Sequence, residues 1–247
     1  MGRSLQDQHY LEVEADAFFE RNNRDVDPDT LRATKRSIVE AIDACGIKPR
    51  RVLEYGCNYG DLLKHYADLG AECHGVEPSR QAIEFGRKSY GSAIHLCQGT
   101  LADNPINASL SATGGDASDL EAERYRGYFD LVVIEDVFCW VSRETLFQSI
   151  ANVDTLLADG GHLFIREFAA LSHSKNRNHH VEEAEVYCFK PAMTHADMLA
   201  GSGVYATIYH KLWMDRLDTW VESAEQDPFQ SRWSDTVLRK SLRDYYR

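Results

Sequence analysis

The stretch VLEYGCNYG, Val52–Gly60, decides the fold of this 247-residue chain. The apolar run that ends at Tyr55 predicts a short strand, and the glycines that follow predict a tight turn. Apolar residues from Leu62 to Leu69 then recur at the spacing of a helix. A strand, a glycine turn and a helix in this order open a doubly wound α/β sheet, in which ligands lie at the carboxyl ends of the strands.

The spacing of the turn limits the kind of ligand. Its pattern, E-x-G-x-x-x-G over Glu54–Gly60, is neither a P-loop nor the G-x-G-x-x-G fingerprint of dinucleotide binding. A second strand pattern, Glu72–Val76, leads to Glu77, seventeen positions after Gly60. A carboxylate at that place can accept hydrogen bonds from both hydroxyls of a ribose. We therefore expect a cofactor that carries a nucleoside, and we disfavour a nicotinamide dinucleotide.

The stretches VLEYGCNYG and GVEPS (Gly75–Ser79) resemble the first two motifs of class I S-adenosylmethionine-dependent methyltransferases. The resemblance implies that the glycine turn passes under the methionine part of the cofactor and that Glu77 holds the ribose. The methionine carboxylate would lie near the amino end of the helix after Gly60, where backbone N–H groups favour an anion. Glu54 would lie near the cationic part of the cofactor.

Two later stretches extend the resemblance. FDLVVIEDV, Phe129–Val137, is typical of a strand buried on both faces, and GGHLFI, Gly160–Ile165, matches the family's fifth strand. The resemblance covers about residues 50–168 and implies five parallel strands with crossover helices, a Rossmann-like sheet. Thr100 stands where the family more often has an acid near the adenine. The residues expected to bind S-adenosyl-L-methionine are Glu54, Gly56, Asn58, Gly60, Glu77, Pro78, Thr100, Leu101 and Glu135.

We expect one domain with two appendages: a helical cap over 1–48, a methyltransferase core over 49–213 and a helical extension over 214–247. The amphipathic segment 10–23 either packs on the core or forms a lid over the site, and the two roles are compatible. Residues 102–118 form a polar, glycine-bearing loop. The extension packs on the domain or joins two subunits into a homodimer.

The resemblance does not supply the general base, because Cys139-Trp140 stands where many family members have Glu-His. Asp136 is the polar residue that the resemblance places at the cleft, and its alternative role is to cap the next helix. Glu167 ends the fifth strand, and the loop that leaves it, Leu171–His180, is rich in histidine, which a solvated loop also explains. The candidates for a base are Asp136, Glu167, His173, His179 and His180.

Composition excludes several other classes of protein. The net charge of −12 disfavours a nucleic-acid substrate, which requires a basic face. No apolar run approaches the roughly 20 residues that cross a bilayer, and residues 1–9 lack the apolar core of a signal peptide. The six cysteines form no C-x-x-C pair, and the histidines lack a diagnostic metal-ligand spacing. We expect a reduced, cytoplasmic protein without a metal site.

We therefore predict a methyltransferase that acts on an oxygen or nitrogen of a small molecule, such as a sugar, a nucleotide sugar or a secondary metabolite. One alternative is a methyltransferase of RNA or protein, although the acidic charge counts against RNA. The other is a protein that binds S-adenosylmethionine without transferring its methyl group, which the missing Glu-His pair leaves open.

Overall fold

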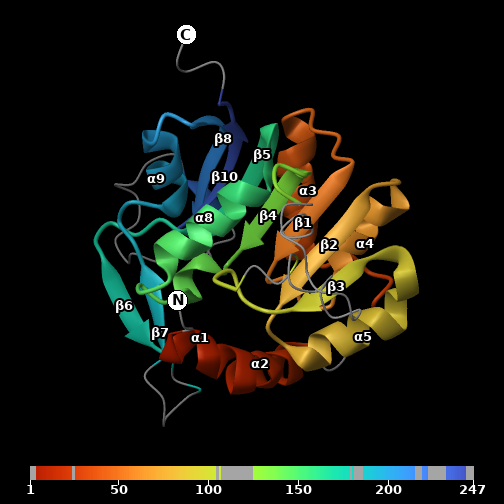
Figure 1. The fold of residues 1–247 in the computed structure, drawn as a ribbon. Helices are drawn as coiled ribbons and strands as arrows, with labels where there is room; N and C mark the ends of the chain where they lie inside the picture. Colours follow the sequence, from red (N-terminus) through yellow and green to blue (C-terminus); the bar gives the residue numbers. More distant parts are fainter. Residues whose placement is uncertain are drawn as a thin grey trace, which may run out of the picture.

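An eight-stranded sheet forms the centre of the computed structural model, which describes residues 4–23, 26–103, 106, 125–178, 180, 186–214, 219–221 and 232–242 (Figure 1). Its strand order is β3-β2-β1-β4-β5-β10-β8-β9, and β1 to β5 are parallel. The strands are β1 Arg51–Tyr55, β2 Glu72–Glu77, β3 His95–Gln98, β4 Phe129–Glu135, β5 Leu157–Phe168, β8 Tyr205–Met214, β9 Thr219–Val221 and β10 Arg232–Lys240.

The chain reverses its direction of travel across the sheet between β1 and β4. It enters the sheet at β1, moves outward through β2 to β3, and returns to place β4 on the other side of β1. The register pairs Tyr55 of β1 with Ile134 of β4, so Gly56 and Glu135 follow at the same edge. Such a switch point leaves a crevice outside the carboxyl ends of the strands, where α/β proteins bind ligands.

Alternating side chains of the inner strands build a core on each face of the sheet. Leu53 and Val132 belong to the core beneath α8 and α9, whereas Val52 and Leu131 belong to the core beneath α3, α4 and α5, and all four are fully buried. The helices are α1 Leu5–His9, the π-helix η1 Tyr10–Glu14, α2 Ala15–Asn22, α3 Ala33–Ala44, α4 Asp61–Asp68, α5 Arg80–Tyr90, α8 Leu146–Leu156 and α9 His195–Gly201, with short 3-10 turns at Gly91–Ala93 (η2) and Phe138–Trp140 (η4).

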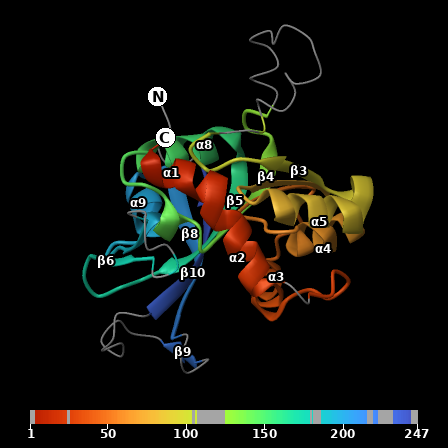
Figure 2. The same cartoon turned by 90° about the horizontal axis from the view of Figure 1, so that it is seen from below.

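The amino-terminal helices cross the carboxyl edge of the sheet (Figure 2). Segment 10–23 is helical as predicted, with one π-helical turn at Tyr10–Glu14. Asp16 of α2 accepts hydrogen bonds from Ser79 Oγ (2.7 Å) and from the backbone N–H of Gln81 (3.1 Å), which attach α2 to the start of α5. The first helices therefore cover the edge at which a ligand is expected. Within the described residues, no helix is both long and apolar enough to span a bilayer.

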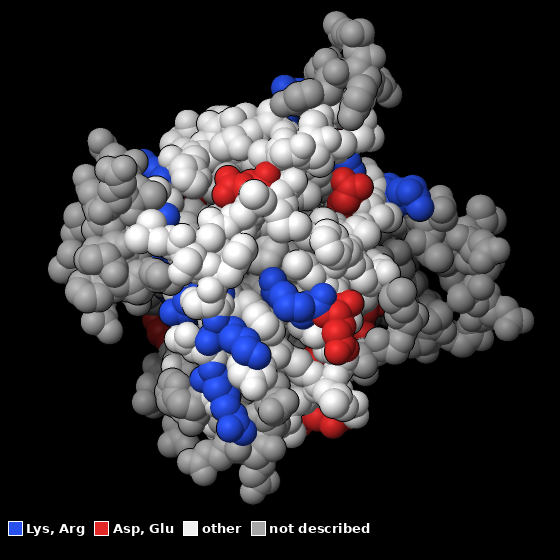
Figure 3. Space-filling view, turned by 90° about the vertical axis from the view of Figure 1, so that its left-hand side faces the viewer, with Lys and Arg blue, Asp and Glu red and all other residues white. Residues whose placement is uncertain are grey.

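A second, two-stranded sheet follows β5. Ser174–Arg177 (β6) and Tyr187–Lys190 (β7) pair in antiparallel fashion. They carry Lys175, Arg177 and Lys190, and basic side chains gather on this face of the molecule (Figure 3). The net negative charge of the chain is therefore unevenly distributed over its surface.

The predicted α/β sheet with its five parallel strands is confirmed, but the helical extension over 214–247 is wrong where the structure describes it. Arg232–Lys240 is a strand, β10, which lies between β5 and β8 and is antiparallel to both. Thr219–Val221 is a strand as well. Ser234 and Asp235 are fully buried in β10. Polar residues at buried positions hide the apolar pattern by which a central strand is normally predicted.

Candidate active site

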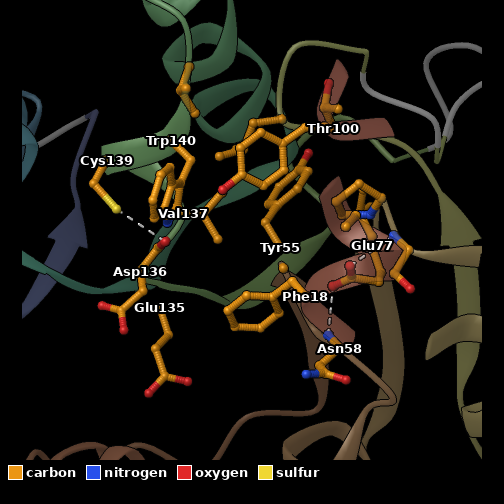
Figure 4. A pocket seen from close by; sticks show the side chains of 18 of the residues that line it. Phe18, Tyr55, Asn58, Glu77, Thr100, Glu135, Asp136, Val137, Cys139 and Trp140 are labelled. Carbon is orange, nitrogen blue, oxygen red and sulfur yellow. Dashed lines mark hydrogen bonds between the residues drawn. The ribbon is translucent and has the colours of Figure 1, made fainter. Parts of the chain in front are cut away.

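A cavity of about 510 Å³ lies at the carboxyl edge of the sheet, beneath the amino-terminal helices (Figure 4). Its volume is within the range of small-molecule sites, about 300–1,000 Å³. We call the end that contains Asn58, Glu77 and Thr100 the Glu77 side, and the end that contains Asp136, Cys139 and Trp140 the Asp136 side.

The glycine turn brings backbone close to the cavity. Gly56 has a φ of 70°, and a Cβ at this position would lie 2.4 Å from Val137 Cγ2. Asn58 has a φ of 53°, in the left-handed region that few non-glycine residues adopt. Gly60, with a φ of 90°, precedes α4 and does not line the cavity. Only a residue without a side chain fits at Gly56 while Val137 keeps its place.

Glu77 is held by backbone groups and keeps the capacity to accept more hydrogen bonds. Its Oε2 accepts from the N–H of Asn58 (2.8 Å), and its Oε1 accepts from the N–H of Ser79 (2.9 Å). Burial raises the pKa of Glu77, and these two hydrogen bonds oppose the shift. Each carboxylate oxygen has a second lone pair. Because Glu77 lines the cavity, it can accept from two adjacent hydroxyls of a ligand.

The loop after β3 closes the Glu77 side. Thr100 and Leu101 line the cavity, whereas Asp103 does not. The backbone N–H and the hydroxyl of Thr100 donate to Asp103 Oδ2, at 3.2 and 2.9 Å. The acid thus turns back to hold Thr100 in place. Most of the predicted loop 102–118 lies outside the described residues.

A buried cluster of charges supports the floor of the cavity. Lys35 Nζ lies 2.5 Å from Glu54 Oε1 and 2.6 Å from Glu135 Oε2. Arg166 continues the cluster: its Nη1 donates to Glu135 Oε1 (3.1 Å), and its Nε and Nη2 donate to the two carboxylate oxygens of Asp235 (2.7 and 2.6 Å). This cluster joins α3, β1, β4, β5 and β10 beneath the site.

Glu54 belongs to that cluster and not to the wall of the cavity. It is fully buried, and burial raises its pKa to about 7 although Lys35 acts in the opposite direction. Glu135 does line the cavity, and its two oxygens are bound by Lys35 and Arg166. Of these two predicted cofactor residues, Glu135 is therefore part of the cavity wall, whereas Glu54 lies behind it.

Asp136 combines an unusual backbone with an unsatisfied side chain. Its φ is 57°, and none of the described residues hydrogen-bonds to its buried Oδ1. Burial, followed by the neighbouring Glu135, raises the pKa of Asp136 well above its ordinary value. Asn58 and Asp136 are the non-glycine residues with positive φ in the described chain, and they follow adjacent strands at the cavity. Backbone strain of this kind concentrates at functional sites.

Aromatic rings and thiols form the wall of the Asp136 side. The rings of Tyr10 and Trp140 lie 5.6 Å apart, and those of Phe168 and Trp233 stack at 3.8 Å. All four rings line the cavity, as do the thiols of Cys139 and Cys188. Sequence reasoning missed Tyr10, Phe168, Cys188 and Trp233. Trp233 would have been found only by recognising β10 as a strand, since it faces Phe168 across the β5–β10 pairing.

Glu167, a predicted base, lies outside the cavity. It is buried, its Oε2 is hydrogen-bonded to His195 Nδ1, and its Oε1 accepts from the N–H of Ala196 (3.0 Å). His195 Nε2 lies 3.3 Å from Arg143 Nη1. Arg143 Nη2 in turn donates to the carbonyl oxygens of Phe138 (2.9 Å) and Val141 (2.7 Å), which flank Trp140. Glu167 therefore supports the wall of the cavity from behind.

The histidine-rich loop also stays away from the cavity. His173 is exposed and its Nδ1 accepts from the N–H of Ala192 (3.3 Å). His180 is exposed too, and its N–H donates to Asn178 Oδ1. Neither residue lines the cavity, and His179 lies outside the described residues. In the described part of the chain, no group of three or more His, Cys, Asp or Glu side chains could hold a metal ion.

The sequence matches the methyltransferase domain family over residues 24–206, and the chain belongs to this family. A relative, an uncharacterised protein of Rickettsia prowazekii, is 29% identical over 122 residues, or 48% of this chain. The match spans 43% of that relative, less than half of its length.

Solved methyltransferases share the fold at low sequence identity. The 1,6-didemethyltoxoflavin-N1-methyltransferase of Burkholderia thailandensis, solved with its substrate and S-adenosylhomocysteine, has a TM-score of 0.63 and 13% identity, covering 98% of this chain and 93% of that one. CcbJ of Streptomyces caelestis has a TM-score of 0.59 and 14% identity, with coverages of 94% and 99%. The N-methyltransferase NodS of Bradyrhizobium japonicum, solved with S-adenosylhomocysteine, has a TM-score of 0.53 and 13% identity, with coverages of 96% and 99%. The Rossmann-like fold is thus confirmed.

Proposed function

We propose that this chain is an S-adenosylmethionine-dependent methyltransferase that acts on a nitrogen or oxygen of a small molecule. The observation that carries the proposal is one cavity with two unlike ends: the glycine turn and Glu77 at one end, and Asp136 among aromatic rings at the other. Membership of the methyltransferase domain family supports it. Two proteins of the same fold, from B. thailandensis and B. japonicum, were solved with S-adenosylhomocysteine.

The residues of the Glu77 side fit such a cofactor. Gly56 lines the cavity with backbone alone, because Val137 occupies the place of a Cβ, and Glu77 can accept from two hydroxyls of a ribose. Asn58 Oδ1 is buried and receives no hydrogen bond from the described residues, so it can accept one from a ligand. The side chains proposed to hold the cofactor from the cavity wall belong to Asn58, Glu77, Pro78, Thr100, Leu101 and Glu135.

The chain itself supplies position, exclusion of water and a proton acceptor. The cofactor, when bound, supplies an electrophilic methyl group on its sulfonium. Tyr10 and Phe18 cover the cavity from the amino-terminal helices, which keeps water from the acceptor and fixes its orientation. An acceptor that arrives protonated must lose its proton. Of the base candidates that the structure describes, Asp136 is the one that lines the cavity.

The size and cover of the cavity support a small acceptor. A cavity of about 510 Å³ must hold both the cofactor and the group to be methylated. The amino-terminal helices lie across it, and Gln6 Nε2 of α1 donates to the carbonyl oxygens of Trp140 (2.5 Å) and Tyr187 (3.0 Å), which fastens this cover to η4 and β7. A large substrate would have to displace these contacts.

Calorimetry with S-adenosylhomocysteine tests the proposal. The wild type should bind this product, and Glu77→Gln should bind it about 10- to 100-fold more weakly, because a hydrogen bond to a charged group contributes about 1.5–3 kcal/mol. Glu72→Gln, at the opposite end of β2, is the control and should bind as the wild type does. A folded wild type that does not bind S-adenosylhomocysteine would contradict the proposal.

A further inference from the structure

The Asp136 side of the cavity contains more carboxylate groups than cations. In the cluster beneath it, Lys35 and Arg166 are bound by the three carboxylates of Glu54, Glu135 and Asp235. Asp136 adds a fourth carboxylate, and neither cation makes a hydrogen bond or an ion pair with it. Four acids thus share two bases, and a ligand cation beside Asp136 would meet a carboxyl group that neither base has paired.

Asp136 is placed to bind that cation. Asp136 lines the cavity, and its buried Oδ1 has no donor among the described residues. Leaving a buried carboxylate oxygen without a partner costs free energy, which a ligand with an N–H donor would remove. With a φ of 57°, Asp136 leaves the extended backbone of β4, so its side chain does not continue the alternation of side chains along that strand.

The walls around Asp136 also favour a cation. Trp140, Tyr10, Phe168 and Trp233 present aromatic rings to this end of the cavity, and ring faces attract ammonium groups. One such contact already exists at the rim, where Lys190 Nζ lies 4.3 Å from the centre of the Phe168 ring. The same rings provide an apolar surface for the rest of a ligand.

From these observations we propose that the methyl acceptor is an amine on an apolar or aromatic body, which enters as an ammonium ion, and that Asp136 binds it and removes its proton. This inference rests on the proposed function and deepens it. In the proton transfer, an N–H bond of the ammonium breaks and an O–H bond forms on the Asp136 carboxylate. The nitrogen keeps the electron pair and becomes the nucleophile, so the step needs no further reactant.

The electrostatics of the cluster support this step. Glu135, Lys35, Arg166 and Asp235 are the charged groups that act on Asp136, and the two acids oppose its ionisation. Burial is the largest cause that raises the pKa of Asp136, and a raised pKa makes the carboxylate a better base. An ammonium ion bound beside Asp136 favours the ionised carboxylate, so its binding opposes the raised pKa of Asp136 and shifts the carboxyl proton toward solvent.

Three probes of similar shape and different charge test the inference by calorimetry on the full chain loaded with S-adenosylhomocysteine: 2-phenylethylamine, 2-phenylethanol and 3-phenylpropionate. The amine should bind at least 10-fold more tightly than the alcohol, and the anion should bind most weakly. Measurements in two buffers of different ionisation enthalpy should show that binding of the amine releases protons. Asp136→Asn should reduce the preference for the amine to within about 3-fold and abolish the proton release.

The asparagine variant is chosen because asparagine tolerates the left-handed backbone that position 136 requires. Equal binding of the amine and the alcohol, failure of the amine to bind at millimolar concentration, or an amine preference that survives Asp136→Asn would overturn the inference. Tight binding of 3-phenylpropionate would also overturn it, because the Asp136 side would then bind anions. The basic residues of β6 and β7 would favour such a ligand. In all of these cases binding of S-adenosylhomocysteine would leave the proposed function standing. If the wild type failed to bind S-adenosylhomocysteine, both the inference and the proposed function would be overturned.

Discussion

Val137 occupies the space that a side chain at Gly56 would need. A Cβ on Gly56 would lie 2.4 Å from Val137 Cγ2, and Gly56 has a φ of 70°. Gly56 follows β1 and Val137 follows β4, and the strand order reverses between these two strands. The cavity therefore depends on close approach of these two turns, and the glycine turn is part of its wall.

Gly56→Ala should lower both stability and cofactor binding. Alanine is disfavoured at positive φ and would displace Val137, so we expect a loss of about 1–3 kcal/mol in the free energy of unfolding. Binding of S-adenosylhomocysteine should fall at least 10-fold. Gly70→Ala isolates the backbone cost, because Gly70 has a positive φ of 90° but open space where its Cβ would lie. If both variants bind equally, contact with Val137 is irrelevant to the site.

The buried pair of Glu54 and Lys35 should make stability depend on pH. The pKa of Glu54 is raised from 4.5 to about 7 in the folded state, so the folded protein holds a proton that the unfolded chain has lost. This contribution to stability is fully present below about pH 4.5 and is lost as pH rises through about 7.

Urea unfolding of the wild type and Glu54→Gln between pH 4.5 and 7.5 measures this effect. The stability of the wild type relative to the variant should fall by roughly 2–3 kcal/mol across the window, since one unit of pKa corresponds to about 1.4 kcal/mol. Comparison with Glu54→Gln cancels the titration of Asp136 and other groups. A relative stability that rises with pH would mean that Glu54 is ionised and its folded pKa is lowered.

Substitution of Phe18 distinguishes the two roles considered for segment 10–23, packing on the core and forming a lid over the site. Its side chain lines the cavity but is 48% exposed, so Phe18→Ala should change the free energy of unfolding by less than about 1 kcal/mol. Phe138→Ala, at 1% exposure, is the reference and should cost about 3–5 kcal/mol. If the segment is a lid, Phe18→Ala should weaken binding of S-adenosylhomocysteine several-fold. A large loss of stability with unchanged binding would instead assign the segment to the core.

Glu167 should behave as a positioning residue. In Glu167→Gln the buried His195 loses a charged partner, and we expect a loss of about 1–3 kcal/mol in the free energy of unfolding. Binding of S-adenosylhomocysteine should stay within about 3-fold, since Glu167 does not line the cavity. His173→Ala, at an exposed loop, is the control for both measurements. Unchanged stability of Glu167→Gln would remove the supporting role that the hydrogen bonds indicate.

Local sequence determined the opening unit of the fold and the Glu77 side of the cavity. A strand, a glycine turn and a helix follow each other directly in the chain, and an acid at the end of the next strand lands beside the turn because neighbouring parallel strands share an edge. The positions of Gly56, Asn58 and Glu77 could therefore be predicted from spacing.

Tertiary structure decided the Asp136 side. Asp136 follows β4, and Glu167 lies one residue before the end of the adjacent strand β5. The N–H of Asp136 donates to the carbonyl of Arg166, so the two acids lie at the same level of the sheet, and sequence alone treats them as equivalent. In the structure Asp136 faces the cavity, while Glu167 binds His195 on α9. Side chains that alternate along a strand define two faces of the sheet. Which face borders the ligand cavity depends on how the rest of the chain packs against the sheet. Trp233 completes the wall for the same reason: β10 enters the sheet far from β5 in sequence, and pairing over that distance leaves no local pattern.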